Sequence, residues 1–183
     1  MFWIQPCAAT KKHVEKKTKP AAPPPVVAGS ECKANENVKL EVDFPPKVTE
    51  GDLLGIRVRT TCDAWLVVYY LEDKGPGAVL WPSQWEPAPR AGPSRPAMLL
   101  SENEARAGKA LEAQLRARGV ASHETFVVFA FADRDAFDRF KPAVGATDAD
   151  GSAYAASLEK KLGELKPSRW AMYSARYTIE PKK

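Results

Sequence analysis

Three cysteines and two histidines are the residues of this sequence whose types most often supply nucleophiles or metal ligands. The cysteines are Cys7, Cys32 and Cys62, and the histidines are His13 and His123. A thiol enzyme needs a cysteine beside a base, and only Cys62 and His123 suggest such a pair, without a third group to orient the base. Their spacing also matches no zinc motif. We therefore expect a protein that is not an enzyme and that has no metal site and no cofactor.

The sequence also lacks the common motifs of nucleophilic catalysis and of phosphate binding. The sequence has no G-x-S-x-G, no G-x-x-x-x-G-K-[ST] and no G-x-G-x-x-G, the patterns of a nucleophile elbow and of phosphate-binding loops. Residues 147–151, TDADG, resemble part of an EF-hand loop. Ala146 and Ser157 would occupy its first and twelfth places, where calcium needs carboxylates. We interpret this segment as an acidic loop before a helix, whose dipole favours carboxylates there.

The positions of Cys32 and Cys62 predict a disulfide. Apolar and polar residues alternate over 37–44 and again over 53–60, which predicts two strands. If the strands pair antiparallel, Cys32 before the first and Cys62 after the second lie at the same end of the pair, within the ~7 Å that a bridge requires. Such a bond favours an extracytoplasmic compartment. The alternative is two reduced, half-buried thiols in a cytosolic protein.

Residues 1–30 have the composition of a flexible tether. Five lysines repel one another, and a proline run favours extended polyproline II, so the segment cannot bury enough apolar surface to order itself. Cys7 is a candidate for lipidation, because Ile4 fits a lipoprotein signal, although Gln5 and Pro6 do not. The alternative is an ordinary exposed cysteine in a tail. The lysines are Lys11, Lys12, Lys16, Lys17 and Lys19, and the prolines are Pro20 and Pro23 to Pro25.

Residues 31–183 are expected to form a single domain. Apolar runs at 64–71 and 124–131 predict buried strands, 78–81 a short strand and 169–180 a long final one. Helices are predicted at 102–118, beginning with a Ser101 and Glu104 capping box, at 133–140 and at 152–166. We therefore predict a mainly β fold, an immunoglobulin-like β-sandwich with two to three inserted helices.

Charge and hydropathy bear on nucleic-acid binding and on membrane-spanning segments. The whole chain of 183 residues has a net charge of +4, most of it in the first 36 residues, so the folded part is nearly neutral. Nucleic-acid binding needs several basic side chains on one face, and we expect none. No apolar run approaches the ~20 residues that span a bilayer.

Trp81 and Trp85 flank a proline-rich loop at 82–96. Aromatic rings beside prolines form recognition surfaces for peptides, glycans or proteins, so both residues are candidates for a binding surface. The alternative is that they plug the open end of the sandwich, because large aromatic residues are usually buried.

From about Val48 to Asp133 the sequence resembles the bacterial domain-of-unknown-function family 4384. The resemblance rests on Gly51–Asp52 before a strand, the strand from Asp63 to Tyr70, the glycine turn at 75–77 and the apolar strand ending at Pro82. It implies a β-rich domain of secreted, lipid-anchored or multidomain envelope proteins, and no catalytic residues.

These observations together predict a non-catalytic interaction or scaffold domain of a bacterial cell-envelope lipoprotein. Its partner would be an envelope or surface protein complex, and its location the periplasm or outer membrane, with a membrane anchor if Cys7 is lipidated. The alternative function is a ligand-binding or hydrolytic domain with a pocket near Trp85 and His123.

Overall fold

The computed structural model describes residues 31–34, 36–72, 76–148 and 151–182. The predicted tether of residues 1–30, with the lipidation candidate Cys7, lies outside the described residues. Within them, the strands are β1 (Leu40–Asp43), β2 (Lys47–Thr49), β3 (Ile56–Thr60), β4 (Ala64–Glu72), β5 (Gly77–Trp81), β6 (Arg90–Ala91), β7 (Ala97–Leu99), β8 (Ser122–Phe131), β9 (Thr147–Asp148) and β10 (Trp170–Glu180). The helices are α1 (Glu102–Arg106), α2 (Arg134–Phe140), α3 (Gly151–Leu162) and the 3₁₀-helix η1 (Pro167–Arg169).

The strands form two sheets. The large sheet has the order β2-β10-β8-β4-β5-β9, with β6 paired to β4, and the small sheet has the order β1-β3-β7. The predicted mainly β fold with two to three helices is thus confirmed. The strand order does not confirm the immunoglobulin-like arrangement in particular, and it includes a parallel pair, β2 with β10.

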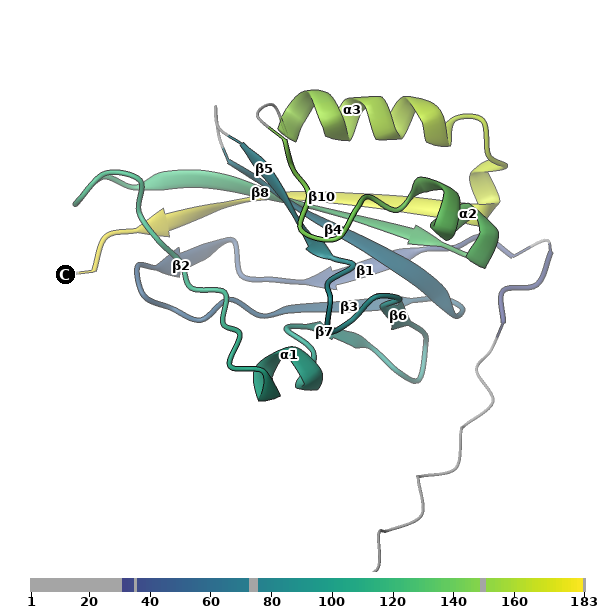
Figure 1. Ribbon diagram of the computed structural model, residues 1–183, viewed down its shortest axis with the longest axis horizontal. Helices are drawn as coiled ribbons and strands as arrows, with labels where there is room; N and C mark the ends of the chain where they lie inside the picture. Colours follow the sequence, from purple (N-terminus) through teal and green to yellow (C-terminus); the bar gives the residue numbers. More distant parts are fainter. Residues whose placement is uncertain (1–30, 35, 73–75, 149–150, 183) are drawn as a thin grey trace, which may run out of the picture.

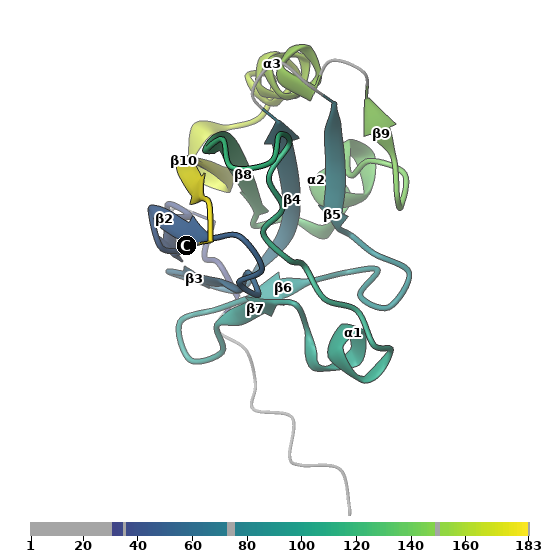
Figure 2. The ribbon, with the colours of Figure 1, turned by 90° about the vertical axis from the view of Figure 1, so that its left-hand side faces the viewer.

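The molecule has three layers, which Figure 1 shows from top to bottom as helices α2 and α3, the large sheet and the small sheet, with α1 at the bottom beside β7. Figure 2 gives the same layers from the side, with α3 and the small sheet on opposite sides of β4 and β8. One core fills the space between the sheets and includes Ile56, Val58 and Phe126. A second core, including Phe129 and Leu162, lies between the large sheet and helices α2 and α3. The long strands β4 and β8 are apolar on both faces because both faces are covered.

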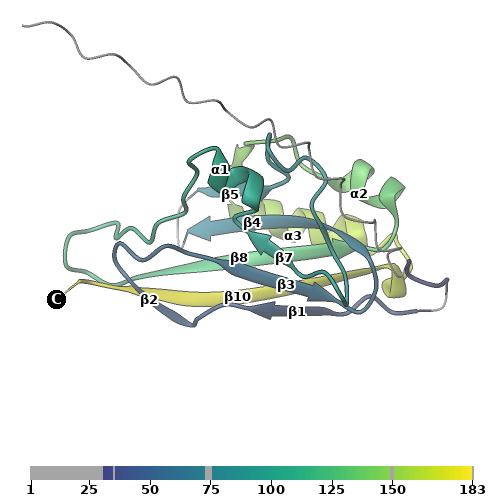
Figure 3. The same cartoon turned by 90° about the horizontal axis from the view of Figure 1, so that it is seen from below.

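Strands β1 and β3 pair antiparallel, as the alternating patterns predict. The register joins Leu40 to Thr60 and Asp43 to Arg57. The short segment between them contains β2, which belongs to the large sheet and pairs with the end of β10. Seen from below in Figure 3, β1 and β3 lie in front of β8 and β10.

The helix predicted over 102–118 is wrong beyond its first turns. Helix α1 ends at Arg106, and Gly108 has a positive φ of 71° that breaks the helical path. The chain then runs beside the segment before β3, where Gly51 N donates to Ala113 O at 2.9 Å and Leu54 N to Leu111 O at 2.7 Å. From this extended path Leu111, Ala113 and Leu115 pack against the inter-sheet core, an arrangement that local helix signals cannot reveal.

None of the described helices has the length and apolar character needed to cross a membrane.

Candidate functional site

The predicted disulfide is present. Cys32 and Cys62 are joined, with their Cα atoms 4.9 Å apart. Cys62 is buried at the end of β3, and the bond holds the start of the described chain against it. The Cys62 thiol is therefore not available to His123, and the pair considered for thiol chemistry does not form. We call residues 31–34, together with this bond, Asp133 and Arg169, the junction.

Arg169 fixes the junction from the other end of the chain. Its guanidinium bonds both carboxylate oxygens of Asp133, at 3.0 and 2.5 Å, and also donates to the carbonyl of Lys33 at 3.1 Å. These hydrogen bonds hold the pKa of Asp133 below its ordinary value and raise that of Arg169. The Asp133 side chain makes no cap bond to α2, although it occupies the N-cap position. The Arg169 guanidinium and the Asp133 carboxylate are thus paired with one another.

Trp81 is buried rather than exposed, with 1% of its surface accessible. Its indole Nε1 donates to the Glu104 carboxylate at 3.0 Å, and the Ser83 hydroxyl donates to the same group at 2.7 Å. The predicted capping box is confirmed, since the Ser101 amide also donates to Glu104, at 2.8 Å. Trp81 is therefore not an exposed binding residue, and its burial agrees with the alternative that large aromatic residues fill the interior. A buried indole needs this hydrogen-bond acceptor.

Trp85 and His123 lie in different places. Trp85 is half-buried, and the ammonium of Lys109 lies 4.5 Å from its ring centroid. His123 is exposed on β8, and its Nδ1 lies 3.1 Å from the hydroxyl of Thr178 on β10. Neither residue lines the two pockets described below. The structure therefore does not bring them together in either pocket.

A pocket of about 500 Å³ lies beside the proline-rich loop. We call it the proline-loop pocket. The loop with β6 supplies one wall, β7 and the residue before it a second, and α1 with its cap a third. Its lining includes Trp81, Glu86, Pro89, Arg95, Met98 and Asn103. Apart from β6, the loop stays out of the sheets, since its prolines cannot donate ladder hydrogen bonds.

The charges of the proline-loop pocket are only partly satisfied. Burial raises the pKa of Glu86, and the nearby negative charge of Glu104 raises it further, while Arg95 lowers it. Arg90 is engaged, since it lies over the ring of Trp65 and 3.4 Å from the carboxylate of Asp63. Two further lining side chains, Glu86 and Arg95, thus offer opposite charges to a ligand.

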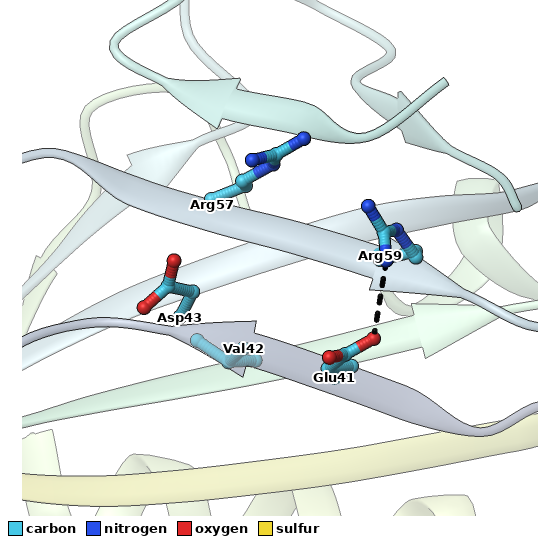
Figure 4. Close-up of a pocket in the computed structure, with 5 residues that line it drawn as sticks. All are labelled: Glu41, Val42, Asp43, Arg57 and Arg59. Atoms are coloured by element: carbon cyan, nitrogen blue, oxygen red, sulfur yellow. Dashed lines mark ion pairs between the residues drawn. The ribbon is translucent and has the colours of Figure 1, made fainter. Parts of the chain in front are cut away.

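The outer face of the small sheet carries a second, smaller hollow of about 280 Å³. Glu41 and Asp43 of β1 and Arg57 and Arg59 of β3 line it, and Figure 4 shows all four side chains on this face. Met98 of β7 is opposite Arg57 in register and also lines the proline-loop pocket. It is 47% exposed, so an apolar side chain stands between the two hollows.

A buried carboxylate outside both hollows is part of the core. Glu124 of β8 is 3% exposed and accepts a hydrogen bond from the Tyr177 hydroxyl at 2.6 Å. Burial and this carboxylate raise the pKa of Tyr177 far above its ordinary value. The Tyr177 ring stacks on Phe126, with centroids 5.0 Å apart. This hydrogen bond therefore joins β8 to β10 inside the inter-sheet core.

The pocket residues that sequence reasoning missed are Glu86, Arg95, Met98 and Asn103. All four come from segments that the sequence showed only as a loop, a short strand and a helix start. The one signal for this region was the tryptophan-flanked proline run. In the part of the chain that the structure describes, no three histidine, cysteine, aspartate or glutamate side chains are grouped so that they could hold a metal ion.

In comparisons with known proteins, no family model matches this chain, and no curated protein or solved structure is significantly similar to it. The resemblance drawn from the order of strands and turns therefore stays a prediction.

Proposed function

We propose that this protein is a non-catalytic interaction domain that binds a segment of another protein in the proline-loop pocket. The observation that carries the proposal is the pocket itself: about 500 Å³, walled by the proline-rich loop, with an exposed methionine at its rim. Pockets of this volume are typical of ligand sites, and an apolar anchor with a few polar groups suits a peptide segment.

The base of the pocket is held by buried hydrogen bonds, an arrangement that favours binding. Trp81 is fixed by its bond to Glu104, and Glu104 is fixed in turn by Ser83 and Ser101. A preformed site loses little conformational entropy when a partner binds. Glu86 and Arg95 then supply charges of both signs, which select a partner by electrostatic complementarity.

The proposed location is the bacterial cell envelope, in the periplasm or at the outer membrane. The Cys32–Cys62 disulfide supports an oxidising compartment. Lipidation of Cys7, with residues 8–30 as a spacer, would attach the domain to the membrane and present the pocket to an envelope or surface protein complex.

The test is to fill the pocket. Asn103 is exposed on α1 and lines the pocket, so the substitution N103W places a large ring in the space. Val144, 51% exposed in the segment before β9, gives the matched control V144W. The full-length wild type and both variants would be purified from the source cells in mild detergent. Proteins that co-purify would be quantified, and the affinity of the leading partner would be measured with purified components.

We expect a discrete partner to be lost with N103W and retained with V144W, and its purified affinity to fall at least tenfold. Circular dichroism would establish that both variants are folded. If N103W is folded and binds every co-purifying protein as the wild type does, the pocket is not the binding site and the proposal is wrong.

A further inference from the structure

The outer face of the small sheet carries charges in two rows. Glu41 and Asp43 point outward from β1, and Arg57 and Arg59 point outward from the neighbouring β3. The register places Glu41 opposite Arg59 and Asp43 opposite Arg57. One row is therefore wholly acidic and the other wholly basic, and each acidic residue has a basic residue at the same height.

Pairing within the sheet leaves these charges mostly exposed to solvent. Glu41 and Arg59 are 3.7 Å apart, and their side chains are 75% and 46% exposed. Asp43 and Arg57, although opposite in register, form no ion pair within the described structure, and Figure 4 marks an ion pair only between Arg59 and Glu41. A loose exposed pair contributes little to stability, so folding alone does not account for the arrangement.

The pattern is complementary to itself. Consider a second copy facing this sheet, related by a two-fold axis that lies in the interface and runs parallel to the strands, between β1 and β3. Rotation about this axis exchanges the two rows and keeps the height along the strands. Glu41 of each copy then faces Arg59 of the other, and Asp43 faces Arg57, which gives four ion pairs between the copies. Such a patch, complementary to its own copy, is what an isologous dimer interface requires.

From this we infer that the β1–β3 face binds a second copy of the same chain, as a symmetric and salt-sensitive dimer. Water leaves the space between the faces, and the charges then interact in a lower effective dielectric than they do on the free surface. Met98, which lines the proline-loop pocket, lies one strand beyond β3 and outside the exchanged rows. The inference does not depend on the function proposed for that pocket.

The experiment uses two charge-reversal variants of the full chain, E41R/D43R and R57E/R59E. Sedimentation equilibrium is measured at low and at physiological salt for each variant alone and for their equimolar mixture. We expect the wild type to dimerise, and its association constant to fall as the salt concentration rises. Each variant alone has like charges facing one another, so its association constant falls at least tenfold. The mixture pairs a basic face with an acidic face, so heterodimers form.

Two controls keep the test sharp. D135R/E159R changes the net charge as E41R/D43R does, but at exposed positions on α2 and α3, and should dimerise as the wild type does. The quadruple variant E41R/D43R/R57E/R59E exchanges the rows, keeps the cross-strand pairing and should also dimerise, which covers the case in which a double variant fails to fold. A wild type that is monomeric at low salt overturns the inference, as does a folded pair of variants that does not associate on mixing.

Discussion

The junction and the proline-loop pocket both join segments that are far apart in the sequence, but they treat charge in opposite ways. At the junction, Arg169 and Asp133 bond one another, and the guanidinium also takes a backbone carbonyl. In the pocket, Glu104 is saturated by three donors, but Glu86 has a raised pKa that burial and a like charge cause.

The difference teaches where binding is to be expected. A region whose polar groups are paired internally gains stability and has little to offer a partner. A region that keeps a half-buried carboxylate beside a like charge gives up some stability, and sites under such strain are often functional. The comparison therefore supports the pocket as the place for a ligand and the junction as a structural brace.

The largest expected loss of stability comes from removing the Cys32–Cys62 disulfide of the junction. The variant C32A/C62A frees a loop that separates the cysteines by 30 residues. The unfolded chain then gains entropy, and the free energy of unfolding should fall by roughly 3 to 4 kcal/mol. Chemical denaturation of wild type and variant measures the change. Reductant should destabilise the wild type by a similar amount and leave the variant unaffected; an insensitive wild type would contradict the prediction.

The second largest loss of stability is expected for the substitution E104A at the base of the pocket. It leaves the Trp81 indole, the Ser83 hydroxyl and the Ser101 amide without their acceptor in a buried place. Unsatisfied buried donors cost about 1–3 kcal/mol each, partly relieved by entering water, so we expect a loss of about 3 kcal/mol. Urea denaturation measures it, with the exposed E112A as the matched control. Equal stability of the two variants would mean that the pocket base is not rigid.

The smallest effects are those of Asp133 and Glu86 on folding stability, and they depend on pH in opposite ways. The pKa of Asp133 is lowered in the folded state, so its stabilisation is present above its unfolded pKa of about 3.9 and is lost as pH falls through the folded pKa. The pKa of Glu86 is raised, so folding is most favourable below its unfolded pKa of about 4.3 and loses stability as pH rises through the folded pKa.

The variants D133N and E86Q test this opposite pH dependence, because each removes one of the two carboxyl groups. At pH 7, D133N should be less stable than the wild type and E86Q more stable, each by less than about 1 kcal/mol because both groups are partly exposed to solvent. Both differences should shrink as the pH approaches 3. Thermal unfolding between pH 3 and 7 measures them, and differences of the same sign for the two variants would remove the contrast between the regions.

The sequence predicted the structure correctly where the signal lies within one element or two neighbouring strands, as with apolar alternation and the capping box. Alternation predicted β1 and β3, and their antiparallel pairing in turn predicted the Cys32–Cys62 bond. The S-x-x-E pattern at Ser101 and Glu104 predicted the start of α1. In each case the residues that decide the structure lie within one element or in two neighbouring strands.

The pocket could not be predicted because its parts meet only through tertiary structure. Glu104 was identified as a helix cap, but its bond to Trp81, 23 residues away, carries no sequence signal. Glu86 and Arg95 look like ordinary loop charges until β5 and β7 fix the two ends of that loop and β6 fixes its middle. The overextended helix had the same cause, since backbone bonds to residues 51–54 competed with the helical path.

The parallel pairing of β2 with β10 has a consequence for biosynthesis. Lys47 and Glu180, 133 residues apart in the sequence, form an ion pair at this seam of the large sheet. A nascent chain leaves the ribosome from its amino end, so β2 must wait, without its neighbour, until β10 has emerged. Pairing over such separations is slow, and the unpaired edge is open to aggregation meanwhile. Deletion of β10 would leave β2 without its neighbour in the large sheet and would make β8 an edge strand.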